Sequence, residues 1–199
     1  MKKGEKRKQE LLQIAYRLFL SRGYENTSVD EIIEEAGIAK GTYYYYFASK
    51  EQMLEEVIDM MIEAQAMQAA KILEADMPVA QKVVGILTCF RLSQDEQTIE
   101  DVLNTPENIL MHEKTNKKII ESIVPVMSEA IEEGIEKGTF SCNNIPERVR
   151  IIMIVSSRLF DDLVFTEKDV VVFIDMIEKM LGAKEGTMGF IKDYILGGN

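Results

Sequence analysis

The sequence predicts an all-α protein of about nine helices. Residues that interrupt helices are scarce, with 4 prolines and 12 glycines among 199 residues. Apolar residues recur at intervals of three and four along most of the chain, which is the spacing of one helix face. Hydrophobic residues make up 46% and charged residues 29% of the chain, a balance typical of a globular protein with a substantial core.

The N-terminal region has the pattern of three helices. Residues 5–22 are expected to form the first helix, because apolar residues share one face and Gly23 follows as a stop. A Thr-Ser pair before an acidic turn is typical of a helix start, so a second helix is expected from just after Ser28 to Gly37. A third, short helix is expected over residues 40–47.

The middle of the chain begins with a longer helix and then becomes less regular. Ser49 and Gln52 have the spacing of a capping box, which predicts a fourth helix that continues to about Ala75. Residues 78–92 are expected to form the next helix. Residues 93–112 are more polar and are expected to contain one or two short helices.

From residue 115 onward the chain contains further helical patterns, and its last two long helices have the clearest pattern after the N-terminal region. Residues 115–137 are helical in pattern, but Pro125 lacks the amide donor, so we expect this segment to divide near Ser122. Helices are then expected over residues 146–165 and 167–181, and the tail keeps enough apolar residues for a short docked helix.

Charge is distributed unevenly along the chain. The net charge of −11 alone would argue against binding to nucleic acid. Residues 1–50, however, hold nine Lys and Arg against seven acidic residues, whereas the remainder holds 14 basic and 27 acidic residues. A basic head on an acidic body suits a protein that touches phosphate at one end. A solvated, charged N-terminal tail would explain the basic residues equally well.

Two short helices joined by a three-residue turn are the signature of a helix-turn-helix motif. Gly37 is expected to adopt the positive φ that reverses the chain, and Ile38 to fill the angle between the helices. The third helix is short enough to enter a major groove by its N-terminal end. Gly41 and Thr42 are small there, so the backbone can approach base edges or phosphate.

The N-terminal region resembles the TetR family of repressors over roughly residues 7–55. The resemblance rests on Leu11, Ala15, Leu18-Phe19, Gly23-Tyr24, Thr27-Ser28-Val29, Ile32, Ala36-Gly37-Ile38, Lys40-Gly41-Thr42, Tyr44, Tyr46-Phe47 and Ser49-Lys50-Glu51. It implies an N-terminal helix-turn-helix DNA-binding domain over residues 1–48, and a C-terminal helical ligand-binding and dimerisation domain over residues 49–199. The C-terminal part resembles the family only in length and helical rhythm.

The resemblance also implies which residues contact double-stranded DNA. These are Thr27, Ser28, Lys40, Gly41, Thr42, Tyr44, Tyr45, Tyr46 and Lys50. Tyr43 and Phe47 fall one turn apart and are expected to face the core. Two departures from the family pattern concern the third helix: Ala39 cannot cap it, and Tyr43 replaces a usual aliphatic residue.

Two alternatives stay open for this region. The run of four tyrosines suits a protein-binding surface as well as a DNA-binding one, which would make the chain a helical interaction module. The alternative for Lys40 and Lys50 is that they are solvated charges.

The C-terminal region is expected to sense a small molecule and to form a homodimer. The helix around residues 151–155 is apolar on nearly every side, so it needs cover from a second source, and a partner copy is the economical one. The predicted dimerisation residues are Ile152, Val155, Leu159, Phe173 and Ile177. Flexible methionines suit a pocket for a largely apolar effector, although they serve equally as core filler. The predicted pocket residues are Met61, Phe90, Met111, His112, Met127 and Met153.

The sequence favours a regulator that binds a palindromic operator as a dimer and is released by its effector. His112 is the sole histidine, and Cys89 and Cys142 form no metal-ligand or disulfide pattern, so neither an enzyme nor a metal or other cofactor is expected. The longest apolar runs are too short to span a bilayer, and no signal peptide is expected, which predicts a cytoplasmic protein.

Overall fold

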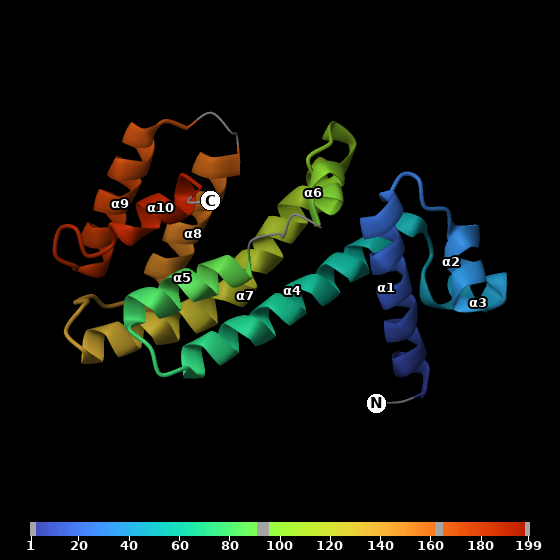
Figure 1. The fold of residues 1–199 in the computed structure, drawn as a ribbon, viewed down its shortest axis with the longest axis horizontal. Coiled ribbons are helices and arrows are strands. Elements are labelled where there is room, and N and C mark those ends of the chain that lie inside the picture. The colour runs from blue at the N-terminus through green and yellow to red at the C-terminus, as the bar shows by residue number, and fades with distance from the viewer. Residues whose placement is uncertain (1–2, 91–95, 162–164, 198–199) are drawn as a thin grey trace. The chain divides into compact units, whose positions relative to one another are not determined.

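The computed structural model describes residues 3–90, 96–161 and 165–197, and within these ranges it contains helices and no strands (Figure 1). The all-α prediction is confirmed. The elements are α1 (Lys3–Arg22), α2 (Val29–Ala36), α3 (Lys40–Tyr46), α4 (Lys50–Glu74), α5 (Val79–Cys89), α6 (Gln97–Leu103), the 3-10 helix η2 (Pro106–Asn108), α7 (Ile109–Glu136), α8 (Ile145–Asp161), α9 (Glu167–Leu181) and α10 (Phe190–Ile195).

The chain packs as two compact units. The first comprises residues 1–64 and 92–118, and the second comprises residues 65–91 and 119–199. Both α4 and α7 therefore begin in the first unit and end in the second. The predicted boundary separates a DNA-binding domain that ends at residue 48 from a ligand-binding and dimerisation domain that begins at residue 49. It concerns function and stays a prediction.

The first unit places α1, α2 and α3 around a small core. Phe19 of α1, Ile32 of α2 and Tyr43 of α3 are each completely buried. Helix α6 lies against α1, where the Thr98 hydroxyl donates to the Phe19 carbonyl oxygen at 3.4 Å. The Tyr16 hydroxyl donates to the carboxylate that precedes α6, so two polar contacts join α6 to α1.

The second unit is built on the apolar face of α9. As the spacing predicts, the residues Val170, Phe173, Ile174, Ile177 and Leu181 are buried. Helix α9 begins at a capping box formed by Thr166 and Asp169. The expected short helix of the tail is α10, which docks through the buried side chain of Ile191.

One expected break is absent: α7 runs without interruption from Ile109 to Glu136, with Pro125 inside it. A proline in a helix costs about 3 kcal/mol, because it removes one backbone hydrogen bond and crowds the preceding turn. Ile123 and Met127 on either side are buried in the core, whereas Pro125 itself is exposed. Packing on the buried face outweighs the local penalty, so the predicted division near Ser122 is wrong.

The described ends of other helices agree with the predictions to within a few residues. Helix α4 begins with the Ser49 hydroxyl accepting from the Gln52 amide at 3.1 Å, which is one half of the predicted capping box. The Gln52 side chain accepts from the Ala48 amide at 2.7 Å, where the predicted box expects the Ser49 amide. Helix α8 is described to Asp161, and residues 162–164 of the predicted helix lie outside the described part of the chain. The same holds for residues 91–92 of the helix predicted over residues 78–92 and for residues 93–95 of the irregular segment.

Candidate nucleic-acid interface

The turn between α2 and α3 has the expected geometry. Gly37 has φ of 60°, in the left-handed region, and its amide donates to carbonyl groups in the last turn of α2. Ala39 stands at the N-cap of α3 and makes no side-chain capping hydrogen bond. The sharp reversal at Gly37 therefore sets the direction in which α3 leaves α2. The first turn of α3 has no side-chain cap at Ala39.

The outer face of α3 is small at its start and aromatic further along. Nothing lies within 4 Å of the position that a Cβ on Gly41 would take, and Thr42 is half-buried. Tyr44 and Tyr45 are 50% and 80% exposed. The predicted outward side chains thus form one accessible surface, and Tyr46 is half-buried beside them.

Lys40 opens this surface with an exposed positive charge. Its ammonium donates to the Asp30 carboxylate of α2 at 2.9 Å, and this hydrogen bond is the main reason that the pKa of Lys40 is raised. The pair is exposed on both sides, so it contributes little to stability and can exchange Asp30 for a phosphate.

Tyr43 and Phe47 hold α3 against the rest of the first unit, as predicted. Both side chains are completely buried, with ring centroids 5.6 Å apart. The Tyr43 hydroxyl donates to the Ser49 carbonyl oxygen at 3.3 Å, and burial raises the pKa of Tyr43 to about 12. The tyrosine that replaces a usual aliphatic residue is accommodated because its polar end reaches a carbonyl group.

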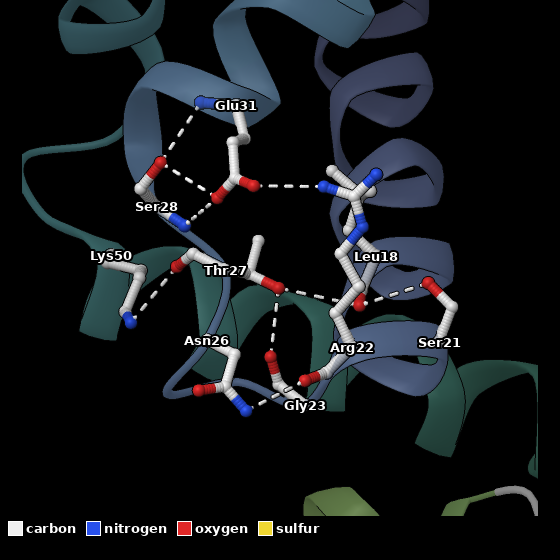
Figure 2. A network of polar contacts seen from close by, with 9 residues as sticks. All are labelled: Leu18, Ser21, Arg22, Gly23, Asn26, Thr27, Ser28, Glu31 and Lys50. Carbon is white, nitrogen blue, oxygen red and sulfur yellow. Dashed lines mark hydrogen bonds and ion pairs between the residues drawn. The ribbon is translucent and has the colours of Figure 1, made fainter.

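A network of polar contacts fixes the start of α2 (Figure 2). The Ser28 hydroxyl accepts from the Glu31 amide at 3.2 Å, and the Ser28 amide donates to the Glu31 carboxylate at 2.7 Å. The same carboxylate accepts from Arg22 of α1 at 2.9 Å. Ser28 is exposed, but the Glu31 carboxylate already occupies its amide and hydroxyl, so a phosphate here would compete with that carboxylate.

The contribution of this network to stability depends on pH. The hydrogen bond from the Ser28 amide is the largest cause of the lowered pKa of Glu31. A carboxyl whose pKa is lower in the folded state stabilises the fold at pH values above its ordinary pKa. That contribution is lost as the pH falls through the lowered value.

Thr27 does not fit the role expected for it. Its side chain is completely buried, and its hydroxyl donates to the carbonyl oxygens of Gly23 at 2.8 Å and Leu18 at 3.4 Å, as Figure 2 shows. Its amide donates to the Tyr24 carbonyl oxygen. In this structure the hydroxyl is therefore unavailable to a phosphate, and Thr27 instead ties the loop after α1 to the end of that helix.

Lys50 is half-buried and contacts the same loop, which joins α1 to α2. Its ammonium donates to the carbonyl oxygens of Tyr24 at 2.9 Å and Thr27 at 3.1 Å, and lies 4.0 Å from the centroid of the Tyr24 ring. An ammonium has three N–H groups, so one is left for a phosphate. Lys50 thus anchors α4 to the segment that precedes α2.

Arg7 is a residue that the sequence did not single out. One of its terminal nitrogens donates to the Ala36 carbonyl oxygen at 3.1 Å, and the other pairs with Glu10. It therefore holds the end of α2 against α1, which positions the turn before α3. A basic residue in a basic N-terminal run gives no signal for such a role, because only the folded chain brings Ala36 beside it.

Comparison with known proteins agrees with this geometry. Residues 11–57, which include α2 and α3, match the family model for bacterial regulatory proteins of the tetR family. The chain has the DNA-binding domain of a TetR-family transcriptional regulator. It is therefore a DNA-binding protein of a non-enzymatic family, and the resemblance inferred from the sequence is confirmed.

Individual TetR-family relatives match to different extents. The HTH-type transcriptional regulator YhgD of Bacillus subtilis is 25% identical over 165 residues, which cover 80% of this chain and 83% of YhgD. The HTH-type transcriptional repressor KstR2 of Mycolicibacterium smegmatis is 38% identical over 80 residues, which cover 40% of this chain and 39% of KstR2. The crystal structure of RolR without ligand has the same fold, with a TM-score of 0.65, 21% identity, and coverage of 93% of this chain and 96% of RolR.

The second unit of this TetR-family regulator contains an apolar cavity. Its walls come from α5, α7, α8, α9 and the segment that ends in α10. Of the predicted pocket residues, Met127 and Met153 line it. Met61, Phe90, Met111 and His112 do not line it, and all of these except Phe90 belong to the first unit. Spacing within single helices could not reveal which methionines of different helices meet.

The five predicted dimerisation residues lie in different environments. Phe173 and Ile177 are 5% and 3% exposed and pack inside their own unit, so they are unavailable to a partner and this assignment is wrong. Val155 and Leu159 are half-buried, and Ile152 lines the cavity. The exposed large apolar residues of α8 and α9 are instead Ile151, Ile154, Val171 and Val172.

None of the helices within the described ranges is long and apolar enough to cross a membrane.

Proposed function

We propose that this regulator is a repressor that binds a palindromic operator as a homodimer through α3 and leaves it when a small molecule binds the second unit. The observation that carries the proposal is the accessible face of α3, where Tyr44 and Tyr45 lie exposed beside the charge of Lys40. The small side chains at the start of α3 and the aromatic side chains further along it suit base edges in a major groove, and Lys40 suits the adjoining phosphates.

The proposed dimer uses the exposed apolar faces of α8 and α9. Ile151 and Ile154 are 50% and 46% exposed and lie one turn apart on α8, while Val171 and Val172 of α9 are 52% and 66% exposed. Apolar side chains gathered on two helices that contact each other favour a self-complementary interface. Two such subunits would present their recognition helices to half-sites roughly 34–36 Å apart.

The proposed effector site is the apolar cavity of the second unit. Ligand-binding cavities in proteins are mostly apolar with a few polar groups. The lining of this cavity has the same composition. Because α4 and α7 continue from the first unit into the second, a ligand that displaces either helix would act on the DNA-binding helices along continuous backbone. The effector would then favour a separation of the recognition helices that the operator does not fit.

Truncation of Tyr45 tests the DNA-binding face. Tyr45→Ala should weaken operator binding between about fivefold and a hundredfold, because one base-edge contact is worth about 1–3 kcal/mol. Stability should not change, since the side chain is 80% exposed. The measurement is fluorescence anisotropy with an operator fragment selected from genomic DNA, repeated over a range of salt concentrations.

Two matched variants sharpen this experiment. Met67→Ala removes another exposed apolar side chain, 62% exposed, and should leave the affinity unchanged. Lys40→Ala should weaken all sequences alike and reduce the salt dependence by about one released ion, whereas Tyr45→Ala should retain that dependence. Wild-type affinity in Tyr45→Ala, or no affinity of the native chain for any genomic fragment, would favour a protein-interaction role for the tyrosines.

Charges on the proposed dimer face should separate the subunits. Ile154→Glu combined with Val172→Glu should be monomeric in sedimentation at concentrations where the native chain is dimeric. Binding to a palindromic fragment should fall by about a hundredfold or more, because the two half-sites no longer bind as a unit. Ile109→Glu with Leu110→Glu is the control, since these residues of the first unit are 59% and 75% exposed, compared with 46% and 66% for Ile154 and Val172. A dimer that persists in the first variant contradicts the assigned face.

A further inference from the structure

The cavity of the second unit has an uncharged lining. Ser156 of α8 and Tyr194 of α10 are the polar residues among those that line it, and the described remainder of the wall is apolar. A charged group buried without a partner is strongly disfavoured, because it loses its hydration and gains nothing in return. A carboxylate or an ammonium group would find no opposite charge among the described residues of this wall.

The buried charges of the same unit are engaged elsewhere. Glu178 is 5% exposed, and its carboxylate accepts from the amides of Gly186 at 3.1 Å and Met188 at 2.8 Å. Lys82 donates to the Leu73 carbonyl oxygen and to the Glu133 carboxylate. Neither group belongs to the cavity wall, so neither supplies a counter-charge to a ligand there.

The two polar residues of the wall are both hydroxyls. A hydroxyl can donate one hydrogen bond and accept others, so Ser156 suits a ligand hydroxyl or carbonyl. Ser156 lies on α8, which limits the polar part of the ligand to the region where α8 borders the cavity. The rest of the ligand faces apolar side chains.

The open space is small. It amounts to about 70 Å³, roughly half of the ~150 Å³ that holds benzene in an engineered protein cavity. A ring-sized ligand therefore needs the walls to give way. Met127, Met153 and Met188 line the cavity from three segments, and unbranched thioethers repack more readily than β-branched side chains. This wall suits a compact ligand and would crowd an extended one.

We infer that the cavity binds a compact, uncharged, largely apolar molecule with one hydroxyl or carbonyl group, which is held by Ser156. The inference rests on the effector role proposed above and adds the chemical class of the ligand. Binding enlarges the space by repacking of the methionines in its wall.

Three ligands that share one ring test the inference: cyclohexanol, cyclohexanecarboxylate and cyclohexylammonium. Each is titrated into the full chain carrying isotope-labelled methionine methyl groups. Cyclohexanol should shift the Met127, Met153 and Met188 signals with a Kd of about a millimolar, and should leave Met61 and Met111 of the first unit unchanged. The two ions should cause no saturable shift at the same concentrations. Equal binding of either ion, or no saturable shift with the alcohol, overturns the inference.

A pair of adjacent serines tests the hydrogen bond. Ser156→Ala should weaken cyclohexanol binding about fivefold, the equivalent of one hydrogen bond. Ser157→Ala is the matched control, because the Ser157 hydroxyl donates to the Ile154 carbonyl oxygen at 3.1 Å and the residue does not line the cavity. Equal affinities in the two variants would remove Ser156 from the site.

Operator affinity measured with the same ligands separates this inference from the proposed function. If cyclohexanol binds as described and operator affinity does not change, the ligand class stands and the release mechanism fails. If cyclohexanol also weakens operator binding, both are supported.

Discussion

Gly182→Ala should destabilise the second unit by about 2–5 kcal/mol. Gly182 ends α9 with φ of 63°, a conformation that costs an alanine about 1–2 kcal/mol. A Cβ at this position would lie 2.1 Å from the Ser141 carbonyl oxygen and 2.8 Å from its carbonyl carbon. The Ser141 amide donates to the Leu181 carbonyl oxygen at 2.9 Å, so this backbone cannot retreat without losing that bond. Urea unfolding followed by circular dichroism measures the loss.

Gly186→Ala is the matched control for this prediction. Gly186 also has a positive φ, of 83°, but nothing lies within 4 Å of the position of its Cβ. This variant should therefore lose only the backbone strain of about 1–2 kcal/mol. If the two variants lose the same free energy of unfolding, the close approach of Ser141 has no energetic effect and the argument fails.

Lys82→Met should lower the free energy of unfolding by about 3 kcal/mol. The Lys82 side chain is 8% exposed, and its ammonium donates to the Leu73 carbonyl oxygen at the end of α4 and to the Glu133 carboxylate of α7, at 2.7 and 2.6 Å. The variant leaves the Leu73 carbonyl oxygen without the Lys82 donor and leaves the half-buried Glu133 with Lys137 alone, and an unsatisfied buried acceptor costs about 1–3 kcal/mol. Methionine keeps most of the side-chain volume, so the loss reports the polar contacts. Lys179→Met, which breaks an exposed pair with Asp175, should cost at most about 0.5 kcal/mol.

The same variant should change the response to acid. Lys137 first and Lys82 second lower the pKa of Glu133 in the folded protein. The native pair therefore stabilises the fold above the ordinary pKa of glutamate, and this contribution is lost as the pH falls through the lowered value. Lys82→Met should lose less stability over that interval. Parallel curves of stability against pH for the two proteins would contradict the role of Lys82.

Local sequence patterns were sufficient for most of the helices. Capping residues, glycines in left-handed positions and apolar spacing act between neighbours along the chain, so Ser28, Gly37 and the stripe of α9 could be placed without tertiary information. The same rules failed at Pro125, where the local penalty is real but burial of the flanking residues in the core exceeds it.

The candidate DNA-binding face was predictable in part. The inward and outward sides of α3 follow from helical spacing, and Tyr43 and Tyr45 lie as expected. The roles of Thr27 and Lys50 did not follow, because their hydrogen bonds go to backbone carbonyl groups that only the folded chain brings within reach. A polar residue type at a motif position does not reveal whether its hydrogen bonds point outward.

By itself, the sequence determined that this chain is helical, that its N-terminal helices form a helix-turn-helix motif, and which side of α3 faces outward. Each of these depends on residues less than about two helical turns apart. The tertiary structure decided which side chains line the cavity and which apolar residues of α8 and α9 stay exposed. Those outcomes depend on contacts between helices that are distant in the chain. When a helix has two apolar faces, its sequence does not tell which face a neighbouring helix will cover.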